Sequence, residues 1–151
     1  MTNIRVGIGY DIHKLQSNLP FILGGIRLDY KKGIVAHSDG DIVFHALSDA
    51  LLGAASLGDI GHFFPDDDPE CKNMNSAIIL KSVMTQLVEL NYKIVNTDIT
   101  IVLEKPKLQP IIQKIKKSVS ENLCINLDQV NIKATTSEKM GFVGKGDGIV
   151  C

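Results

Sequence analysis

The sequence predicts an α+β fold, with a mixed β-sheet of about four to five strands that is covered on one side by helices. Segments with the alternation or the β-branched residues of strands lie near both ends and in the middle of the chain, and segments with apolar residues three and four apart lie between them. A chain of 151 residues is long enough to bury one hydrophobic core. We therefore expect a single domain over residues 1–151.

The composition makes several classes of function improbable. Lys and Arg total 16 and Asp and Glu total 17, so the net charge of −1 does not indicate a nucleic-acid surface. The three cysteines lack the Cys-x-x-Cys spacing of zinc or redox sites, which is typical of reduced thiols in a cytoplasm-like compartment. No apolar stretch reaches membrane-spanning length. We expect a soluble cytoplasmic protein with no nucleic-acid or membrane partner.

Residues 4–13 are expected to form the first strand, because apolar residues alternate there with glycines and polar residues. The alternation places Asp11 and His13 on one face, and the glycines leave room for a ligand or another backbone. A carboxylate and an imidazole two residues apart can bind one zinc ion, and a third imidazole would leave a fourth position open for substrate. His45 is the candidate third ligand. The alternative is that Asp11 and His13 are only the polar side of a strand.

A helix is expected from a cap at Ser38 or Asp39 to about Leu57. Before it, residues 20–28 predict a second strand that is bent or bulged at its glycine pair, and residues 30–33 predict a turn. The residues of the helix that should face the core are Val43, Leu47, Ala50, Ala54 and Leu57.

On the opposite face of this helix, His45 and Asp49 are neighbours four residues apart. This arrangement suits a metal-binding imidazole whose second nitrogen donates to a carboxylate, although a polar surface pair is the more frequent explanation of one such pair taken alone. After the helix, residues 58–68 are expected to be irregular and acidic. Asp59 and the backbone around Gly61 could bind substrate hydroxyls there, or the loop could be a solvated connector, and His62 is expected at the surface.

Two more helices and one strand are expected in the second half of the chain. A helix from Asn75 or Ser76 to Asn91 should turn Leu80, Val83, Met84, Leu87 and Val88 inward. Residues 94–104 predict a strand, and residues 105–110 predict a turn into the last helix. The inward residues of that last helix are Ile112, Ile115, Val119 and Leu123.

The last segment, from Val130, runs from a strand into a glycine-rich loop, and residues 149–151 could begin a closing strand. Three consecutive hydroxyls at 135–137 and the cation of Lys145 could bind phosphate together with backbone N–H groups. Glu138 would repel phosphate unless a divalent cation lay between them, which suggests magnesium. The alternative is a polar strand end with a tight hairpin.

The motifs are Arg5-x-Gly-x-Gly-x-Asp11-x-His13, Ala36–Asp41 with His45, Gly58–Gly61, Phe64–Asp66, Pro106-Lys107, and Ala134–Lys139 with Gly141-Phe142. Over essentially the whole chain, and in this order, they resemble the 2-C-methyl-D-erythritol 2,4-cyclodiphosphate synthases of the non-mevalonate isoprenoid pathway. The resemblance implies that the 2-phosphate of 4-diphosphocytidyl-2-C-methyl-D-erythritol 2-phosphate attacks the β-phosphorus of the same molecule and expels CMP.

The resemblance also implies the ligands of two metal ions and the residues around the substrate. It implies Zn²⁺ at Asp11, His13 and His45, and Mg²⁺ or Mn²⁺ between Glu138 and the substrate diphosphate. It implies that His37 and Thr136 are the catalytic pair that orients the reacting phosphate. The substrate contacts that it implies are Asp11, His13, His37, Ser38, Asp59, Ile60, Gly61, Phe64, Pro65, Asp66, Asp68, Leu103, Lys107, Leu108, Gln109, Thr135, Thr136, Ser137, Glu138, Phe142 and Lys145.

The same resemblance implies a homotrimer whose active sites lie at the subunit interfaces and bind a cytidine diphosphate substrate. Two other classes remain open from the residues themselves. One is a metal-dependent phosphohydrolase that releases inorganic phosphate, and the other is a non-enzymatic nucleotide-binding module. Product analysis distinguishes the first, and turnover distinguishes the second.

Overall fold

The computed structural model describes residues 4–65, 68–71 and 73–151. Its elements, in chain order, are β1 (Ile12–Ser17), β2 (Ile22–Leu23), β3 (Ile26–Arg27), β4 (Lys32–Val35), α1 (Ile42–Ala55), α2 (Ile60–Phe63), the 3₁₀ turn η1 (Pro69–Cys71), α3 (Ser76–Glu89), β5 (Thr97–Val102), α4 (Ile112–Leu123), the 3₁₀ turn η2 (Leu127–Gln129), β6 (Val130–Thr135), α5 (Gly141–Gly144) and β7 (Gly148–Val150).

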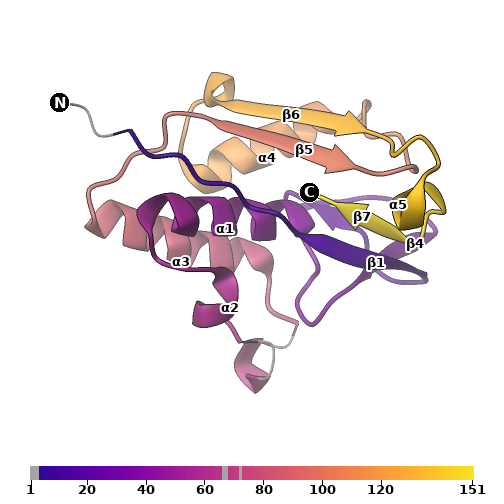
Figure 1. Ribbon diagram of the computed structural model, residues 1–151, viewed down its shortest axis with the longest axis horizontal. Helices are drawn as coiled ribbons and strands as arrows, with labels where there is room; N and C mark the ends of the chain where they lie inside the picture. The colour runs from indigo at the N-terminus through magenta and orange to yellow at the C-terminus, as the bar shows by residue number, and fades with distance from the viewer. Residues whose placement is uncertain (1–3, 66–67, 72) are drawn as a thin grey trace.

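Five of the strands form one mixed sheet, in the order β4-β1-β7-β5-β6 (Figure 1). β5 and β6 are parallel, and the other neighbouring pairs are antiparallel. The closing strand β7 therefore lies in the middle of the sheet and joins the N-terminal strands to β5 and β6. The predicted mixed sheet of about four to five strands is confirmed.

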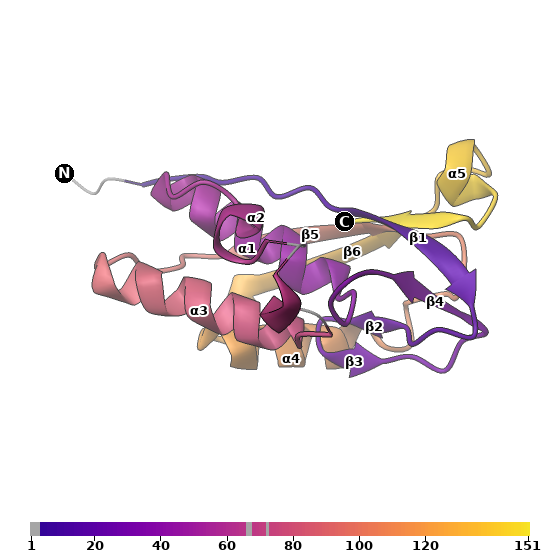
Figure 2. The same ribbon diagram turned by 90° about the horizontal axis from the view of Figure 1, so that it is seen from below.

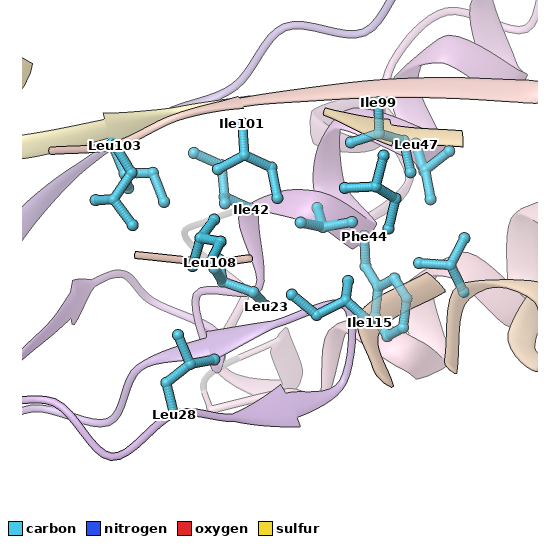
Figure 3. Close-up of a cluster of buried hydrophobic side chains, with 14 of the residues drawn as sticks. Leu23, Leu28, Ile42, Phe44, Leu47, Ile99, Ile101, Leu103, Leu108 and Ile115 are labelled. Carbon is cyan, nitrogen blue, oxygen red and sulfur yellow. The ribbon is translucent and has the colours of Figure 1, made fainter. Parts of the chain in front are cut away.

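The helices α3 and α4 lie on one side of the sheet, whereas α5 stands out on the other side (Figure 2). Between the sheet and the helices, Ile99 and Ile101 of β5 pack with Phe44 of α1 and Ile115 of α4 (Figure 3). All four side chains are nearly inaccessible to water. This one-sided core explains why the sheet strands bury alternate residues.

Only the end of the predicted first strand belongs to the sheet. Residues 4–11 are extended but run along α1, where Cβ atoms on Gly7 and Gly9 would collide with the carbonyl oxygens of Ala50 and Ala46. The glycines thus permit the close approach of a second backbone, which is one of the two uses expected for them. The apolar side chains of this segment point away from the helix and are exposed.

The region before α1 differs from the prediction in three respects. Residues 20–28 form a hairpin of two strands rather than one bent strand, because Gly24 and Gly25 both have positive φ and make its turn. The predicted turn at 30–33 overlaps β4, which pairs with β1. The cap of α1 is Asp41 and not Ser38 or Asp39, since its side chain accepts from the N–H groups of Val43 and Phe44.

The later elements follow the prediction closely, with local exceptions. In α3, Ile79 completes the buried stripe with Leu80, Val83 and Leu87, whereas Val88 is 67% exposed because it lies on the flank of that stripe. The predicted irregular loop after α1 contains one helical turn, α2, capped by Asp59. Across the described ranges, no helix is both long enough and apolar enough to cross a membrane.

Candidate metal and phosphate site

The structure brings Asp11, His13 and His45 together. Asp11 Oδ2 lies 3.1 Å from His13 Nε2 and 3.2 Å from His45 Nδ1, and the two ring nitrogens are 3.4 Å apart. One ligand atom from each residue lies within 4.8 Å of the other two, which suits a single metal ion. Asp11 and His13 are adjacent on one face of the first segment, and His45 comes from the first turn of α1. The predicted convergence of these three side chains is therefore confirmed.

The donor set fits zinc chemically, because two imidazole nitrogens and one carboxylate oxygen leave one position of a tetrahedron open. The carboxylate is also held in its charged form. Burial acts to raise the pKa of Asp11, but the lowering effects, led by the hydrogen bond with His13, outweigh it and hold that pKa well below its usual range.

The second nitrogen of His45 does not contact Asp49, contrary to the prediction. His45 Nε2 lies 2.9 Å from Ser76 Oγ at the start of α3 and 3.2 Å from Ser38 Oγ. The Ser76 hydroxyl in turn donates a hydrogen bond to Asp39 Oδ1. Spacing on one helix could not indicate these partners, because they come from a loop and from another helix.

Asp49 holds the loop after α1 instead. Its Oδ1 accepts from the N–H of Ile60 at 2.8 Å, and burial raises the pKa of Asp49 more than this bond lowers it. Asp59 caps the same short helix by accepting from the N–H of His62. The loop with Asp59, Ile60 and Gly61 is thus tied to α1 one turn beyond His45.

The predicted hydroxyl cluster forms a turn after β6. Thr136 Oγ1 donates to Glu138 Oε1 at 3.1 Å, and both side chains are exposed. Glu138 and Lys139 have positive φ. Glu104 at the end of the β5 segment organises this turn, since its Oε1 accepts from the N–H groups of Ser137 and Lys139 and from the Ser137 hydroxyl. The N–H of Lys139 contributes most to holding the pKa of Glu104 below its usual range.

Within one protomer this turn lies far from the metal group. The registers pair Thr135 with Val102, Val102 with Val150, and Val150 with Ile12. Three strand spacings of about 4.8 Å place Thr135 roughly 14 Å from Ile12. Beyond this row, Asp11 and Thr136 leave the sheet in opposite directions, because β1 and β6 run the same way (Figure 1). One phosphate group therefore cannot contact both within a single chain.

The other predicted contacts are spread around these two groups. His37 is exposed in the loop before α1, and Ser38 reaches His45 from the same loop. Phe142 of α5 lies beside His13, Asp147 and Gly148 in an open groove of about 410 Å³, and Lys145 follows the same helix. Asp66 lies outside the described residues. In the remaining set, the side chains of Leu103 and Leu108 are buried, those of Phe64 and Ser137 are half-buried, and those of Pro65, Asp68, Lys107, Gln109 and Thr135 are exposed.

Sequence reasoning missed three residues that shape the site: Asp39, Ser76 and Glu104. The sequence patterns predict Asp39 and Ser76 as residues at helix starts and Glu104 as the end of a strand, and they predict no contact of these residues with the site. A polar residue at a helix start next to a candidate ligand loop is the only signal that the sequence offers for Ser76.

Over nearly its whole length, the chain is similar to proteins of a single family. The model of the YgbB family matches residues 4–151. A 2-C-methyl-D-erythritol 2,4-cyclodiphosphate synthase of Clostridium novyi (strain NT) is 51% identical over 146 residues, covering 97% of this chain and 93% of the relative. The protein of the same name from Erwinia tasmaniensis is 47% identical over 148 residues, covering 98% and 94%.

Two solved structures agree with this similarity. The bifunctional IspDF from Campylobacter jejuni superposes with a TM-score of 0.94 at 39% identity, over 98% of this chain but only 40% of that longer chain. The IspF CDP complex of Plasmodium falciparum superposes with a TM-score of 0.88 at 36% identity, over 100% of this chain and 93% of that chain.

Proposed function

The chain belongs to the YgbB family, and from this premise we propose that it is the enzyme that cyclises 4-diphosphocytidyl-2-C-methyl-D-erythritol 2-phosphate. The 2-phosphate oxygen attacks the β-phosphorus of the diphosphate, and the bond to the leaving CMP breaks. The product is 2-C-methyl-D-erythritol 2,4-cyclodiphosphate, an intermediate of non-mevalonate isoprenoid biosynthesis, and we expect the enzyme in the cytoplasm. The convergence of Asp11, His13 and His45 carries the proposal.

Zinc is the metal that we propose for this group. A bound zinc ion would supply positive charge and Lewis acidity beside a phosphate of the substrate. The chain's contribution is to hold two imidazoles and one carboxylate on an extended segment and a helix that pack together, so that little rearrangement accompanies binding. A metal-dependent phosphorus–oxygen lyase is the class that follows.

A second divalent ion, magnesium or manganese, is proposed on Glu138. Its carboxylate is exposed at the tip of the turn after β6, where only the Thr136 hydroxyl contacts it among the described residues. A hard cation commonly takes one protein carboxylate together with substrate phosphate oxygens, which removes the repulsion between Glu138 and a diphosphate.

The other predicted residues then position the substrate. His37 and Thr136 would orient the reacting phosphate, and Asp59 with the backbone at Gly61 would hold the erythritol hydroxyls. The loop at 103–109, with Lys107, would hold the cytidine. Phosphoryl transfer needs mainly positioned charge and orientation, and no protein nucleophile, so binding groups that hold both ends of one substrate suit the reaction.

The separation of the metal group from the Thr136 turn supports a homotrimer in which a second protomer completes each site. An exposed apolar row supports it too, because Ile4, Val6, Ile8, Tyr10 and Ile12 are 46–87% exposed in the single chain. Such a row is normally covered by another protein surface.

Product analysis with the purified protein tests the proposal. We expect stoichiometric CMP and cyclic diphosphate, without inorganic phosphate. Release of inorganic phosphate would indicate a phosphohydrolase, and binding of CDP without turnover would indicate a nucleotide-binding module. Either result would refute the cyclase.

A further inference from the structure

The imidazole of His45 lies between two acidic groups that compete for its proton. Nδ1 lies 3.2 Å from Asp11 Oδ2, and Nε2 lies 2.9 Å from Ser76 Oγ, which is bonded to Asp39. A neutral imidazole has one proton, so it can donate to only one of the two sides. The nitrogen that stays bare is the one that can bind a cation.

The hydroxyl of Ser76 decides between the two nitrogens. The ionised carboxylate of Asp39 only accepts, and it takes hydrogen bonds from the Ser76 N–H, the Ser76 hydroxyl and the N–H of Asp41. A hydroxyl has a single proton, and that of Ser76 is used in the hydrogen bond that it donates to Asp39. Towards His45 it can therefore only accept, so the proton of the ring stays on Nε2 and Nδ1 is bare.

Ser38 cannot impose this choice, although its Oγ lies 3.2 Å from the same nitrogen. It accepts from the N–H of Gly40, and within the described ranges its proton has no acceptor other than His45. The Ser38 hydroxyl can thus rotate to serve either tautomer. Only the chain of hydrogen bonds from His45 through Ser76 to Asp39 has a fixed donor-to-acceptor direction.

The position of this chain of hydrogen bonds in the fold protects it from water. Ser76 is fully buried, His45 is 8% exposed, and Asp39 is half-buried. Ser76 is also the first residue of α3, and its N–H binds the same carboxylate. These hydrogen bonds hold the start of α3 against the loop that precedes α1. His45 lies in the first turn of α1, directly after that loop.

We propose that Asp39 and Ser76 are positioning residues that keep the proton of His45 on Nε2 and leave Nδ1 free for a metal ion. This inference rests on the proposed zinc site. Without Ser76, the Asp11 carboxylate would draw the proton to Nδ1, and the ion would have to displace it. Loss of the partner of a ligating histidine typically weakens metal affinity about 10–100-fold.

The test compares Ser76→Ala and Ser76→Cys with the wild type. Cysteine fills nearly the same space but is a weak acceptor, so both variants should behave alike. Nitrogen-15 NMR of labelled histidine in metal-free protein reports the tautomer, at about two pH units above the ordinary histidine pKa of about 6.5. Signals missing in His45→Gln assign the ring. Competition with a chromophoric chelator gives the zinc dissociation constant.

Ser48→Ala is the matched control. Ser48 is a fully buried serine on α1, one turn from His45, and its hydroxyl has no hydrogen-bond partner in the part of the chain that the structure describes. We expect the proton on Nε2 in the wild type and in Ser48→Ala, with equal zinc affinity.

In both Ser76 variants we expect the proton on Nδ1 and a zinc dissociation constant raised about 10–100-fold. An unchanged tautomer or an unchanged zinc affinity in these variants would overturn the proposed positioning role. A wild-type protein that binds no zinc would instead refute the metal site of the proposed function, so the two failures are distinguishable.

Discussion

Removal of the His45 imidazole tests the metal group directly, because this residue is the only one of the three ligands that comes from a helix. His45→Ala deletes one nitrogen ligand and leaves Asp11 and His13 in place on their strand segment. Alanine favours the helical conformation, and Ser76 keeps its bond to Asp39, so the chain should stay folded.

The size of the effect follows from linkage between metal binding and folding. At a free zinc concentration about 100 times the dissociation constant, binding to the folded state stabilises it by about 2.7 kcal/mol. In a chain of 151 residues each kcal/mol raises Tm by about 2–4 °C, so zinc should raise the wild-type Tm by about 5–11 °C. If the variant binds about 100-fold more weakly, the same zinc concentration gives about 0.4 kcal/mol, or roughly 1 °C.

Thermal unfolding of chelator-treated protein, with and without added zinc, measures this difference. His62→Ala is the matched control, because His62 is an exposed histidine on α2 that belongs to no metal group in the described chain. It should keep the full wild-type shift. An equal zinc-induced rise of Tm in His45→Ala and the wild type would show that the imidazole of His45 does not bind the ion. This result would contradict the proposed zinc site.

Three further predictions concern other parts of the molecule. Thr136→Ala should lower kcat more than it changes KM, since its hydroxyl is proposed to act on the reacting phosphate; in steady-state kinetics, a pure rise in KM would contradict this role. Asp41→Ala should lower the free energy of unfolding by about 2–5 kcal/mol in urea titrations, because four N–H groups in the hairpin turn and α1 lose their acceptor; a loss below about 0.5 kcal/mol would contradict it. Burial raises the pKa of the Cys151 thiol to about 12, so iodoacetamide at neutral pH should label the exposed Cys124 first, as read by peptide mass spectrometry, and equal rates would contradict this.

The metal group could be predicted from the sequence because local rules suffice for most of it. Alternation along an extended segment puts Asp11 and His13 on one face whether the segment pairs with a strand or packs on a helix. The glycines of that segment add a second indication, because glycines at these positions allow either a ligand or another backbone to come close. That neighbour is α1, the helix that supplies His45.

The partners of His45 could not be predicted in the same way. The spacing of His45 and Asp49 is correct for neighbours on a helix, but neighbours bind each other only if nothing better is within reach. The N–H of Ile60 reaches Asp49 through the loop after the helix, and Ser76 reaches His45 from the start of α3. Both contacts depend on how α1, α2 and α3 pack together, which no local pattern specifies.

The place of the phosphate turn depends on β7, the shortest strand of the five-stranded sheet. Gly148–Val150 has only three residues, so alternation cannot identify its neighbours, yet it lies between β1 and β5. If β5 had paired directly with β1, the Thr136 turn would lie about one strand spacing, or roughly 5 Å, closer to the strand that carries His13. These three residues therefore widen the separation between the Thr136 turn and the metal group within one protomer. Since they separate the groups, the catalysis that we propose requires a second protomer to complete each site.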